Sequence, residues 1–259
     1  MNMPTNLQGA VAVASGASRG IGRATALALA EAGADIVCVA RSTEAAPSKL
    51  AGTIEETARL VRALGRRALA VPCDISREEQ VEALARRALA EFGRVDVLVN
   101  NAAVNFWAPF AETPTKRWDL VLNVNLRGAV LCTQAFLPQM LRQGSGRMIN
   151  VSSGAATDID AAVRLGIIPY AVSKAAVEKL TELLALELRP QGIAVNCLRI
   201  ETSVATEGAR FLNPEADLSG WEKPEVAAEA ILWLATRELS YTGRILTIAE
   251  ARREMSPNP

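Results

Sequence analysis

The chain has 259 residues, equal numbers of basic and acidic side chains (28 each) and no histidine, and half of its residues are hydrophobic. The balanced charge argues against nucleic acid or an acidic surface as a partner. The four cysteines are far apart and have no CxxC or Cys/His spacing, so neither a metal site nor a disulfide is expected. No apolar run reaches the roughly 18 residues of a membrane span, and the first ten residues, MNMPTNLQGA, lack the regions of a signal peptide. These features predict a soluble cytoplasmic protein.

The chain alternates between short apolar runs and longer amphipathic stretches. The few polar residues of the runs lie at their ends, as in parallel strands covered on both faces. The runs predict strands at residues 10–15, 35–40, 67–73, 95–100, 146–152, 192–198 and 244–248. The stretches between them predict helices at 20–32, 49–65, 76–92, 114–142, 170–189 and 224–236. This order predicts an α/β fold: a doubly wound parallel seven-stranded sheet with helices on both faces, in one Rossmann domain over residues 1–259.

Local patterns refine this framework at three places. Ser76, with Glu79 three residues later, predicts a capping box at the start of a helix. The connection at residues 41–53 is longer than usual, which predicts either a lid beside a nucleotide site or a solvated insertion. The polar tail at 249–259 follows a core at about 7–248 and is expected to be ordered only if it docks.

The first strand runs into a glycine-rich turn, GASRGIG, at the start of a helix. Glycines let the backbone approach a pyrophosphate, and the helix N-terminus supplies N–H groups and a positive dipole. The flanking strand and helix, and a second strand about 20 residues on, make the pattern specific. A tight glycine turn without a ligand is the alternative. The predicted cofactor contacts in this turn are Gly16, Ser18, Arg19, Gly20, Ile21 and Gly22.

The end of the second strand bears on which dinucleotide is bound. NAD-binding folds usually place an acidic residue there for the ribose 2′-hydroxyl, but this chain has Ala40, Arg41 and Ser42. A guanidinium pairs with a 2′-phosphate, and Arg19 can reach the same side. The pattern therefore favours NADP(H) over NAD(H), with Arg41 and Ser42 as cofactor contacts. Two solvated surface arginines are the alternative.

Further motifs follow the glycine loop in a consistent order. They are CDI at 73–75, NNAA at 100–103, NVNLRG at 123–128, INVSS at 149–153, YAVSK at 170–174 and VNCL at 195–198. Through them the chain resembles the short-chain dehydrogenases/reductases from about residue 7 to 248. The long loop after Arg41 and the phrase TPTKRWDLVLNVNLRG resemble a narrower branch, which includes the hydroxysteroid-dehydrogenase-like protein 2 group and relatives similar to citronellol dehydrogenases.

The resemblance implies roles for residues at matching positions. For the cofactor, Asp74 is expected to bind the adenine amino group with Ile75 beside the ring, and the adenine ribose is expected over Asn101, Ala102 and Ala103. For the chemistry, Asn125 is expected to bind a relay water, and a serine of the 152–153 pair the substrate oxygen. Tyr170 is expected to be the acid/base, while Lys174 binds the nicotinamide ribose and lowers the pKa of Tyr170.

Proton transfer without histidine is explained by the Tyr170–Lys174 spacing. Residues four apart share one face of a helix, and the ammonium, with the charge of an oxidised nicotinamide, favours tyrosinate. A shift of about three pKa units corresponds to about 4 kcal/mol. The serine and Tyr170 hydroxyls would hold a carbonyl oxygen, and Tyr170 would supply the proton that accompanies hydride transfer; the reverse reaction oxidises an alcohol.

Two departures from the family pattern affect the site. The loop after Ser153 is longer than usual, which leaves open whether Ser152 or Ser153 faces the substrate; the motif favours Ser153. Ile200-Glu201 stands where the family usually has Pro-Gly, so the 199–206 loop is expected to run differently. Within it, the main chain of Val204 is the candidate contact for the nicotinamide amide.

The predicted pocket wall is mostly apolar and suits a hydrophobic alcohol or carbonyl compound. Its residues are Asn105, Phe106, Trp107, the 157–169 loop and the 202–221 segment with Phe211 and Trp221. Packing of these aromatic residues against neighbouring subunits is the alternative. The resemblance implies that helices 114–142 and 170–189 form a dimer contact, in a homodimer or homotetramer.

Two other functions share parts of this pattern. A catalytically silent nucleotide-binding scaffold or sensor would keep the glycine loop without turnover, and the missing Pro-Gly is compatible with it. An epimerase or dehydratase shares the fold but usually has a longer chain with a sugar-binding C-terminal part. The set of Asn125, Ser153, Tyr170 and Lys174 favours the oxidoreductase.

Overall fold

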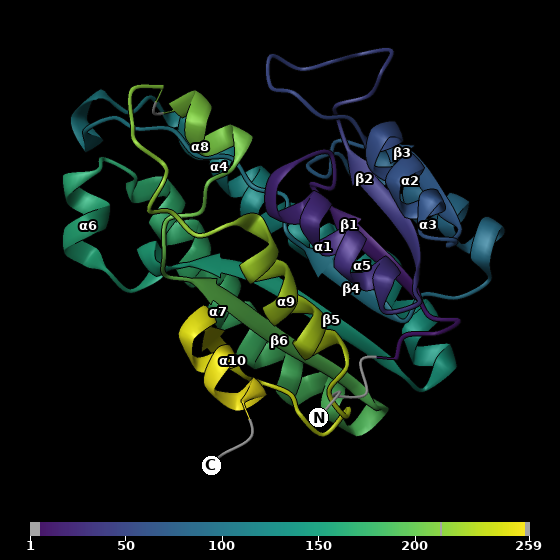
Figure 1. The fold of residues 1–259 in the computed structure, drawn as a ribbon. Coiled ribbons are helices and arrows are strands. Elements are labelled where there is room, and N and C mark those ends of the chain that lie inside the picture. Colours follow the sequence, from purple (N-terminus) through teal and green to yellow (C-terminus); the bar gives the residue numbers. More distant parts are fainter. Residues whose placement is uncertain (1–5, 213, 257–259) are drawn as a thin grey trace.

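A seven-stranded sheet forms the centre of the protein, in a computed structural model that describes residues 6–212 and 214–256. The strands lie in the order β3-β2-β1-β4-β5-β6-β7 (Figure 1), and all neighbours pair in parallel. Their bounds are β1 (Val11–Ser15), β2 (Asp35–Ala40), β3 (Ala68–Pro72), β4 (Val97–Asn100), β5 (Gly146–Ser153), β6 (Ile193–Ile200) and β7 (Ile245–Thr247). The predicted doubly wound parallel sheet is confirmed.

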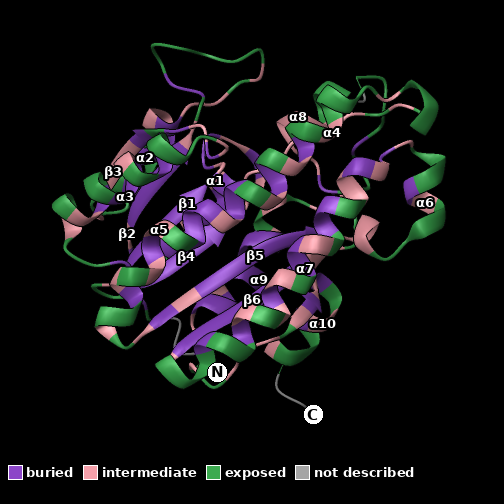
Figure 2. Ribbon diagram, turned by 180° about the vertical axis from the view of Figure 1, so that it is seen from behind, coloured by how far each residue is buried: buried purple, intermediate pink, exposed green. Residues whose placement is uncertain are grey.

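Helices cover both faces of this sheet. On one face lie α1 (Gly20–Glu31), α2 (Ile54–Ala63) and α9 (Pro224–Ala235). On the other lie α3 (Glu78–Phe92), α5 (Gly128–Gln143) and α7 (Ile168–Leu188). The remaining helical segments are η1 (Phe110–Glu112), α4 (Thr115–Leu122), η2 (Asn123–Arg127), η3 (Gly154–Ala156), α6 (Ile159–Arg164), η4 (Arg189–Gln191), α8 (Glu207–Leu212) and α10 (Ile248–Met255). In Figure 2 the strands are mostly buried, and exposed residues lie on the outer helix faces and loops.

The first strand shows how the sequence separates the two faces. Successive strand side chains point to opposite sides of a sheet, so Ala12 and Ala14 join the core under α1 while Val11 and Val13 join the core under α5. β1 lies between β2 and β4, where the strand order reverses. Ligands of open α/β sheets bind at such a point, outside the carboxyl ends of the strands.

The helix predicted at 114–142 consists of α4, one π turn (η2) and α5. By length and composition alone, Thr115–Gln143 is apolar enough to cross a membrane, although half of its most apolar stretch is buried inside the protein. Phe136 and Met140 are fully buried against the sheet. Core packing therefore accounts for the apolar character of this helix.

The capping box predicted at Ser76 is wrong. Helix α3 begins at Glu78 with Arg77 at its N-cap, and no side chain caps it. The amide and hydroxyl of Ser76 instead donate to Asp74 Oδ1, at 3.1 and 2.7 Å. Asp74, two residues earlier, competes successfully for the serine because it forms a local turn that closes before the helix begins.

A capping box does occur at Thr247 and Glu250, at the start of α10. The expected polar tail thus begins with a helix, whose Ile248 and Ala251 are buried. The Glu201 carboxylate accepts hydrogen bonds from the Ile248 and Ala249 amides, both at 2.9 Å. Glu201, at the position where glycine was expected, therefore caps a helix, and no non-glycine residue in the described chain has a positive φ.

Replacement of Glu201 by alanine tests this cap. Loss of a side-chain cap costs about 0.5–2 kcal/mol, and a carboxylate also stabilises the positive end of a helix dipole. We expect Glu201→Ala to lower the melting temperature by about 2–6 °C in a chain of this size, measured by circular dichroism. Glu229→Ala, at an exposed position in the middle of α9, is the matched control; equal melting temperatures of the two variants would contradict the cap.

Candidate active site

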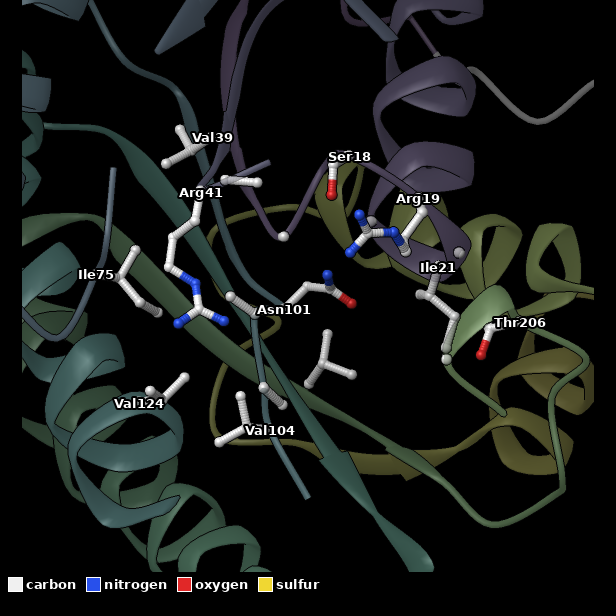
Figure 3. Close-up of a pocket in the computed structure, with 18 of the residues that line it drawn as sticks. Ser18, Arg19, Ile21, Val39, Arg41, Ile75, Asn101, Val104, Val124 and Thr206 are labelled. Carbon is white, nitrogen blue, oxygen red and sulfur yellow. The ribbon is translucent and has the colours of Figure 1, made fainter. Parts of the chain in front are cut away.

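One cavity of about 470 Å³ lies at the carboxyl ends of the central strands (Figure 3). It brings together the predicted site residues from segments that are far apart in the sequence. They are Gly16, Ser18, Arg19, Gly20, Ile21, Gly22, Arg41, Ser42, Asp74, Ile75, Asn101, Ala102, Ala103, Ser153, Tyr170, Lys174 and Val204. Of the predicted catalytic and cofactor-binding residues, Asn125 alone does not line it.

The glycine loop is shaped by close backbone approaches. Gly16 and Gly20 have φ values of 71° and 52°, which favour glycine. A Cβ on Gly22 would lie 2.2 Å from the Gly16 carbonyl oxygen and 2.6 Å from Asn101 Nδ2. Gly22 therefore lets α1 start directly against the turn, with its N-terminus at the cavity. This is the close approach that a bound pyrophosphate requires.

The Ser15 hydroxyl ties the end of β1 to the end of β4. It donates to the Val99 carbonyl at 3.2 Å and accepts from the amides of Asn101 and Ala102, at 3.0 and 3.1 Å. Asn101 Nδ2 donates back to the Ser15 carbonyl at 2.9 Å. The two strand ends thus form one rigid floor under the cavity.

Arg19 holds the long loop that follows β2. Its Nε donates to the Ala51 carbonyl at 2.7 Å. Its Nη2 lies within hydrogen-bond distance of Ser42 Oγ, Ser48 Oγ and the carbonyls of Leu50 and Gly52. The 41–53 segment is therefore an ordered loop fixed to the glycine turn, and Ser42 is buried within it. In Figure 3 the guanidinium groups of Arg19 and Arg41 both lie at the cavity.

Glu207 links the segment after β6 to the start of α1, a contact that sequence reasoning missed. Its Oε2 accepts from the Gly20 amide at 2.9 Å, and its Oε1 pairs with Arg23 Nη2 at 2.8 Å. Thr206 and Gly208, on either side of it, line the cavity, whereas Glu207 does not. The Glu207 carboxylate thus connects α8 to α1 from outside the cavity. Its neighbours Thr206 and Gly208 are thereby held at the cavity wall. No local pattern signals a pairing across 187 positions.

The two serines of β5 have different environments. Ser152 is buried and its hydroxyl donates to Glu178 Oε1 at 2.7 Å, whereas Ser153 forms a side-chain hydrogen bond with Tyr170. Both Ser152 and Ser153 contribute to the cavity lining. The choice of Ser153 to hold a substrate oxygen stays a prediction, and its pairing with Tyr170 supports it.

Tyr170 and Lys174 lie one turn apart on α7, as their spacing predicts. The Lys174 ammonium donates to the Val151 carbonyl at 2.7 Å and lies 5.5 Å from the centroid of the Tyr170 ring. Burial lowers the pKa of Lys174 to about 8, and nearby Cys197 and Glu178 oppose that fall. The lysine is 3% exposed, and the part of its surface that is accessible lines the cavity.

The pKa of Tyr170 differs from the expected direction. Burial raises the pKa of this phenol, and the hydrogen bond with Ser153 only partly opposes the rise. The expected fall caused by Lys174 is not met in the protein alone, because the ammonium is held at a carbonyl beside the ring. The expectation also included a second cation, the oxidised nicotinamide, whose charge would favour tyrosinate.

Asn125 occupies the π turn between α4 and α5. Its Oδ1 accepts from the Val104 amide at 2.8 Å, and its Nδ2 donates to the Val104 carbonyl and to Ser173 Oγ, both at 3.0 Å. The side chain therefore holds the irregular segment after β4 against α7. Short π turns inside α-helices often occur at functional sites. The predicted water contact of Asn125 stays a prediction.

The predicted apolar wall does not line the main cavity: Asn105, Phe106, Trp107, Phe211, Trp221 and the 157–169 loop are all absent from its lining. Trp107 and Phe211 are 43% and 56% exposed, and Ile159 on α6 is 75% exposed. Figure 1 shows α6, α8 and α4 at the same end of the molecule. Of the segment 202–221, Thr202, Val204, Thr206 and Gly208 reach the main cavity. These exposed apolar side chains therefore lie outside the cavity, whose own lining is mixed.

A glycine turn at a helix start, set beside a tyrosine and a lysine in one cavity of a doubly wound sheet, defines a Rossmann-type nucleotide-binding protein. The model of the short chain dehydrogenase family matches residues 10–216. The chain belongs to this family of oxidoreductases, whose members use NAD(P)(H).

Individual relatives match along most of the chain. The short chain dehydrogenase/reductase astE of Aspergillus oryzae is 36% identical over 258 residues, with 94% of each chain covered. Hydroxysteroid dehydrogenase-like protein 2 of Bos taurus is 33% identical, and 93% of this chain matches 56% of that protein. A crystal structure of a provisional NAD(P)-dependent gluconate 5-dehydrogenase from Beutenbergia cavernae, with NADP bound at low occupancy, is 32% identical, with a TM-score of 0.83. That alignment covers 98% of this chain and all of the other.

Gly22→Ala tests the close approach that shapes the glycine loop. The added methyl group would overlap the Gly16 carbonyl, and such overpacking costs about 1–3 kcal/mol. We expect a lower melting temperature and at least a tenfold loss of dinucleotide affinity, measured by fluorescence titration with NADPH and NADH. Gly220→Ala is the matched control, because a Cβ there would meet no atom within 4 Å. Normal cofactor affinity in Gly22→Ala would show that the loop is not the phosphate site.

Proposed function

We propose that this protein is an NADP(H)-dependent oxidoreductase that interconverts an alcohol and a carbonyl group on a hydrophobic small molecule, with Tyr170 as the acid/base. The carrying observation is that Ser153, Tyr170 and Lys174 line the same cavity as the glycine loop. Family membership supports hydride transfer as the reaction type. The exposed apolar side chains of Trp107, Phe211 and Ile159 support a hydrophobic substrate.

The residues present fit a dinucleotide. Gly16 and Gly22 let the turn and the start of α1 pack closely against Asn101, because a Cβ on either would lie 2.7 Å or less from its amide nitrogen, and the α1 N-terminus lines the same cavity. The residues proposed to contact the adenine, its ribose and the nicotinamide amide all line this cavity, which supports those roles: Asp74, Ile75, Asn101, Ala102, Ala103 and Val204. When bound, the dinucleotide supplies or accepts the hydride.

The preference for NADP(H) rests on charge at the end of β2. The chain has Ala40 in place of the acidic residue that would repel a 2′-phosphate. Arg41 lines the cavity and is exposed, so its guanidinium is available for a phosphate. Arg19 adds a second cation whose position is already fixed by the 41–53 loop.

Arg41→Ala should therefore change cofactor choice. We expect the unmodified protein to bind NADPH at least tenfold more tightly than NADH, about 1.4 kcal/mol. Arg41→Ala should remove most of this difference and leave NADH affinity nearly unchanged. The control is Arg59→Ala, which removes an exposed arginine of α2 that pairs with Glu44. Isothermal titration calorimetry measures the affinities of all three proteins for NADPH and NADH. Equal affinities of the unmodified protein for the two cofactors would overturn the assignment of NADP(H).

The proton chemistry follows from three side chains. Ser153 and Tyr170 hold the substrate oxygen between their hydroxyls, and the Tyr170 hydroxyl gives or takes the proton. Lys174 lines the cavity, where its ammonium would bind the ribose hydroxyls of the dinucleotide. Asn125 fixes the segment after β4 to α7 through Val104 and Ser173.

Tyr170→Phe and Lys174→Ala should have different effects. Tyr170→Phe keeps the ring but deletes the proton, so kcat should fall about 10²- to 10⁴-fold with normal cofactor affinity. Lys174→Ala should also weaken cofactor binding, and should move the alkaline ionisation of the rate profile upward because tyrosinate loses its nearest cation. With no histidine in the chain, an ionisation between about pH 6 and 9 has no imidazole contribution. Full activity of Tyr170→Phe would refute the mechanism.

The substrate is identified by a panel of carbonyl compounds and alcohols, assayed by nicotinamide absorbance with both cofactors. Turnover of apolar ketones or alcohols supports the proposal. Tight cofactor binding without turnover of any compound favours the nucleotide-binding scaffold instead. The feature compatible with a scaffold is the missing Pro-Gly. The structure gives this sequence difference another reason, because Glu201 at that position caps a helix.

We also propose a homodimer or homotetramer in the cytoplasm. The outer face of α7 exposes Val172, Leu183 and Leu186, the last at 74%, and Leu141 of α5 is also exposed. An apolar face of this kind supports the helix contact that the family resemblance implies. Light scattering after size-exclusion chromatography measures the oligomeric state.

A further inference from the structure

A buried carboxylate lies directly behind the proposed catalytic residues. Glu178 is 7% exposed and does not line the cavity. Its Oε1 accepts from Arg199 Nε at 2.8 Å and from Ser152 Oγ at 2.7 Å, while its Oε2 accepts from Arg199 Nη2 at 2.7 Å. A buried charge is costly unless it is paired and hydrogen-bonded. The structure therefore maintains this charge with a two-pronged ion pair and a hydroxyl.

The position of Glu178 relates it to Lys174. The two residues are four positions apart on α7, so they share one helix face, and both are buried. Ser152 spans them, because its hydroxyl donates to Glu178 at 2.7 Å and lies 3.4 Å from the Lys174 carbonyl. The Lys174 ammonium bonds to the carbonyl of Val151, the residue before Ser152. One short piece of β5 thus connects the ammonium and the carboxylate.

We propose that Glu178 is a positioning residue that keeps Lys174 protonated at the cofactor cavity, with Arg199 and Ser152 holding the carboxylate in place. The role of Lys174 itself rests on the function proposed above. Glu178 acts through charge, because it lies one helical turn behind the ammonium and outside the cavity. Without Glu178, the Lys174 ammonium would be buried with no anion on the same side of α7.

The groups around Lys174 define what else can affect its charge. From α7 come Tyr170 and Glu178, and from β6 come Cys197 and Arg199. Burial raises the pKa of Cys197 to about 12, so its thiol is neutral near pH 7. Burial also raises the pKa of Tyr170, which keeps the phenol neutral there. Glu178 is therefore the anion that favours the ammonium form, and Arg199 moderates it.

The direction of the effect separates a charge role from a packing role. Burial already lowers the pKa of Lys174 to about 8. Removal of the negative charge while packing is kept should lower the lysine pKa further. If Glu178 only supported the packing, its loss would admit water, and the lysine pKa would rise toward its usual value of about 10.4.

The experiment is an NMR titration of lysine ε-carbons in protein labelled with ¹³C-lysine. The chain has only Lys49, Lys116, Lys174, Lys179 and Lys223, so Lys174→Arg assigns the signal. We expect Glu178→Gln to lower the pKa of Lys174 by about one unit. An unchanged or raised pKa of Lys174 in this variant would overturn the proposal. The titration needs no substrate and no cofactor, so it stands apart from the test of the oxidoreductase function.

A matched control lies one turn further along the same helix. Glu182 pairs with Lys179 at the surface, so Glu182→Gln should leave the pKa of Lys174 unchanged. If Glu178→Gln does not fold, the double variant Glu178→Gln/Arg199→Met replaces both members of the ion pair, which is often tolerated. The pKa of Lys174 should again fall, because Glu178 is the charge on its own helix face. A rise would contradict the proposal.

Cofactor binding gives a second readout. A fall of one unit takes the protonated fraction of Lys174 at pH 8 from half to about a tenth. Glu178→Gln should therefore bind NADPH about fivefold more weakly than the unmodified protein at pH 8, and equally well at pH 6. Equal weakening at both pH values would indicate general damage and contradict the proposal. If neither NADPH nor NADH binds the unmodified protein, the proposed function fails, while the NMR titration still decides the role of Glu178.

Discussion

The closest backbone approach in the site is that of Gly22 to the carbonyl of Gly16, and the rest of the cavity depends on it. A methyl group there would lie 2.2 Å from the carbonyl oxygen, so the helix can start where it does only with glycine. That start brings the α1 N-terminus to the crevice between β1 and β4, where Ser15 has already joined the two strand ends. Tyr170 and Lys174 then approach from α7 on the other side of the same crevice.

The titratable groups of the site, Tyr170 and Lys174, lie close together in surroundings with little access to water. Burial raises the pKa of Tyr170 and lowers that of Lys174 to about 8, so both groups are neutral more readily than in water. Such opposed shifts are common where proton transfer occurs. The layer behind them contains Glu178 and Arg199, which form an ion pair at 2.7 Å. The Tyr170–Lys174 pair and the Glu178–Arg199 pair thus lie in two adjacent layers of the structure.

Much of the fold and part of the site could be predicted because their signals are local. Buried strands, the glycine turn and the Tyr170–Lys174 spacing each lie within a few residues of sequence. Glu207 and Glu201 could not be predicted, because their partners lie 187 and 47 positions away. The sequence around Asn125 has no composition that would predict a π turn. Ser76 does not cap a helix because its hydroxyl donates to Asp74 instead. The pKa of Tyr170 depends on burial, which only the assembled structure defines.

The hydrogen bonds that Arg19 makes with the 41–53 loop bear on the entropy of binding. A loop of this length would normally lose conformational freedom when it closes around a ligand, and that loss weakens affinity. Here Nε and Nη2 of one guanidinium restrain the segment from Ser42 to Gly52 before any ligand arrives. The loop therefore loses its conformational entropy when the protein folds rather than when a ligand binds. Arg41 lies at the start of this ordered loop.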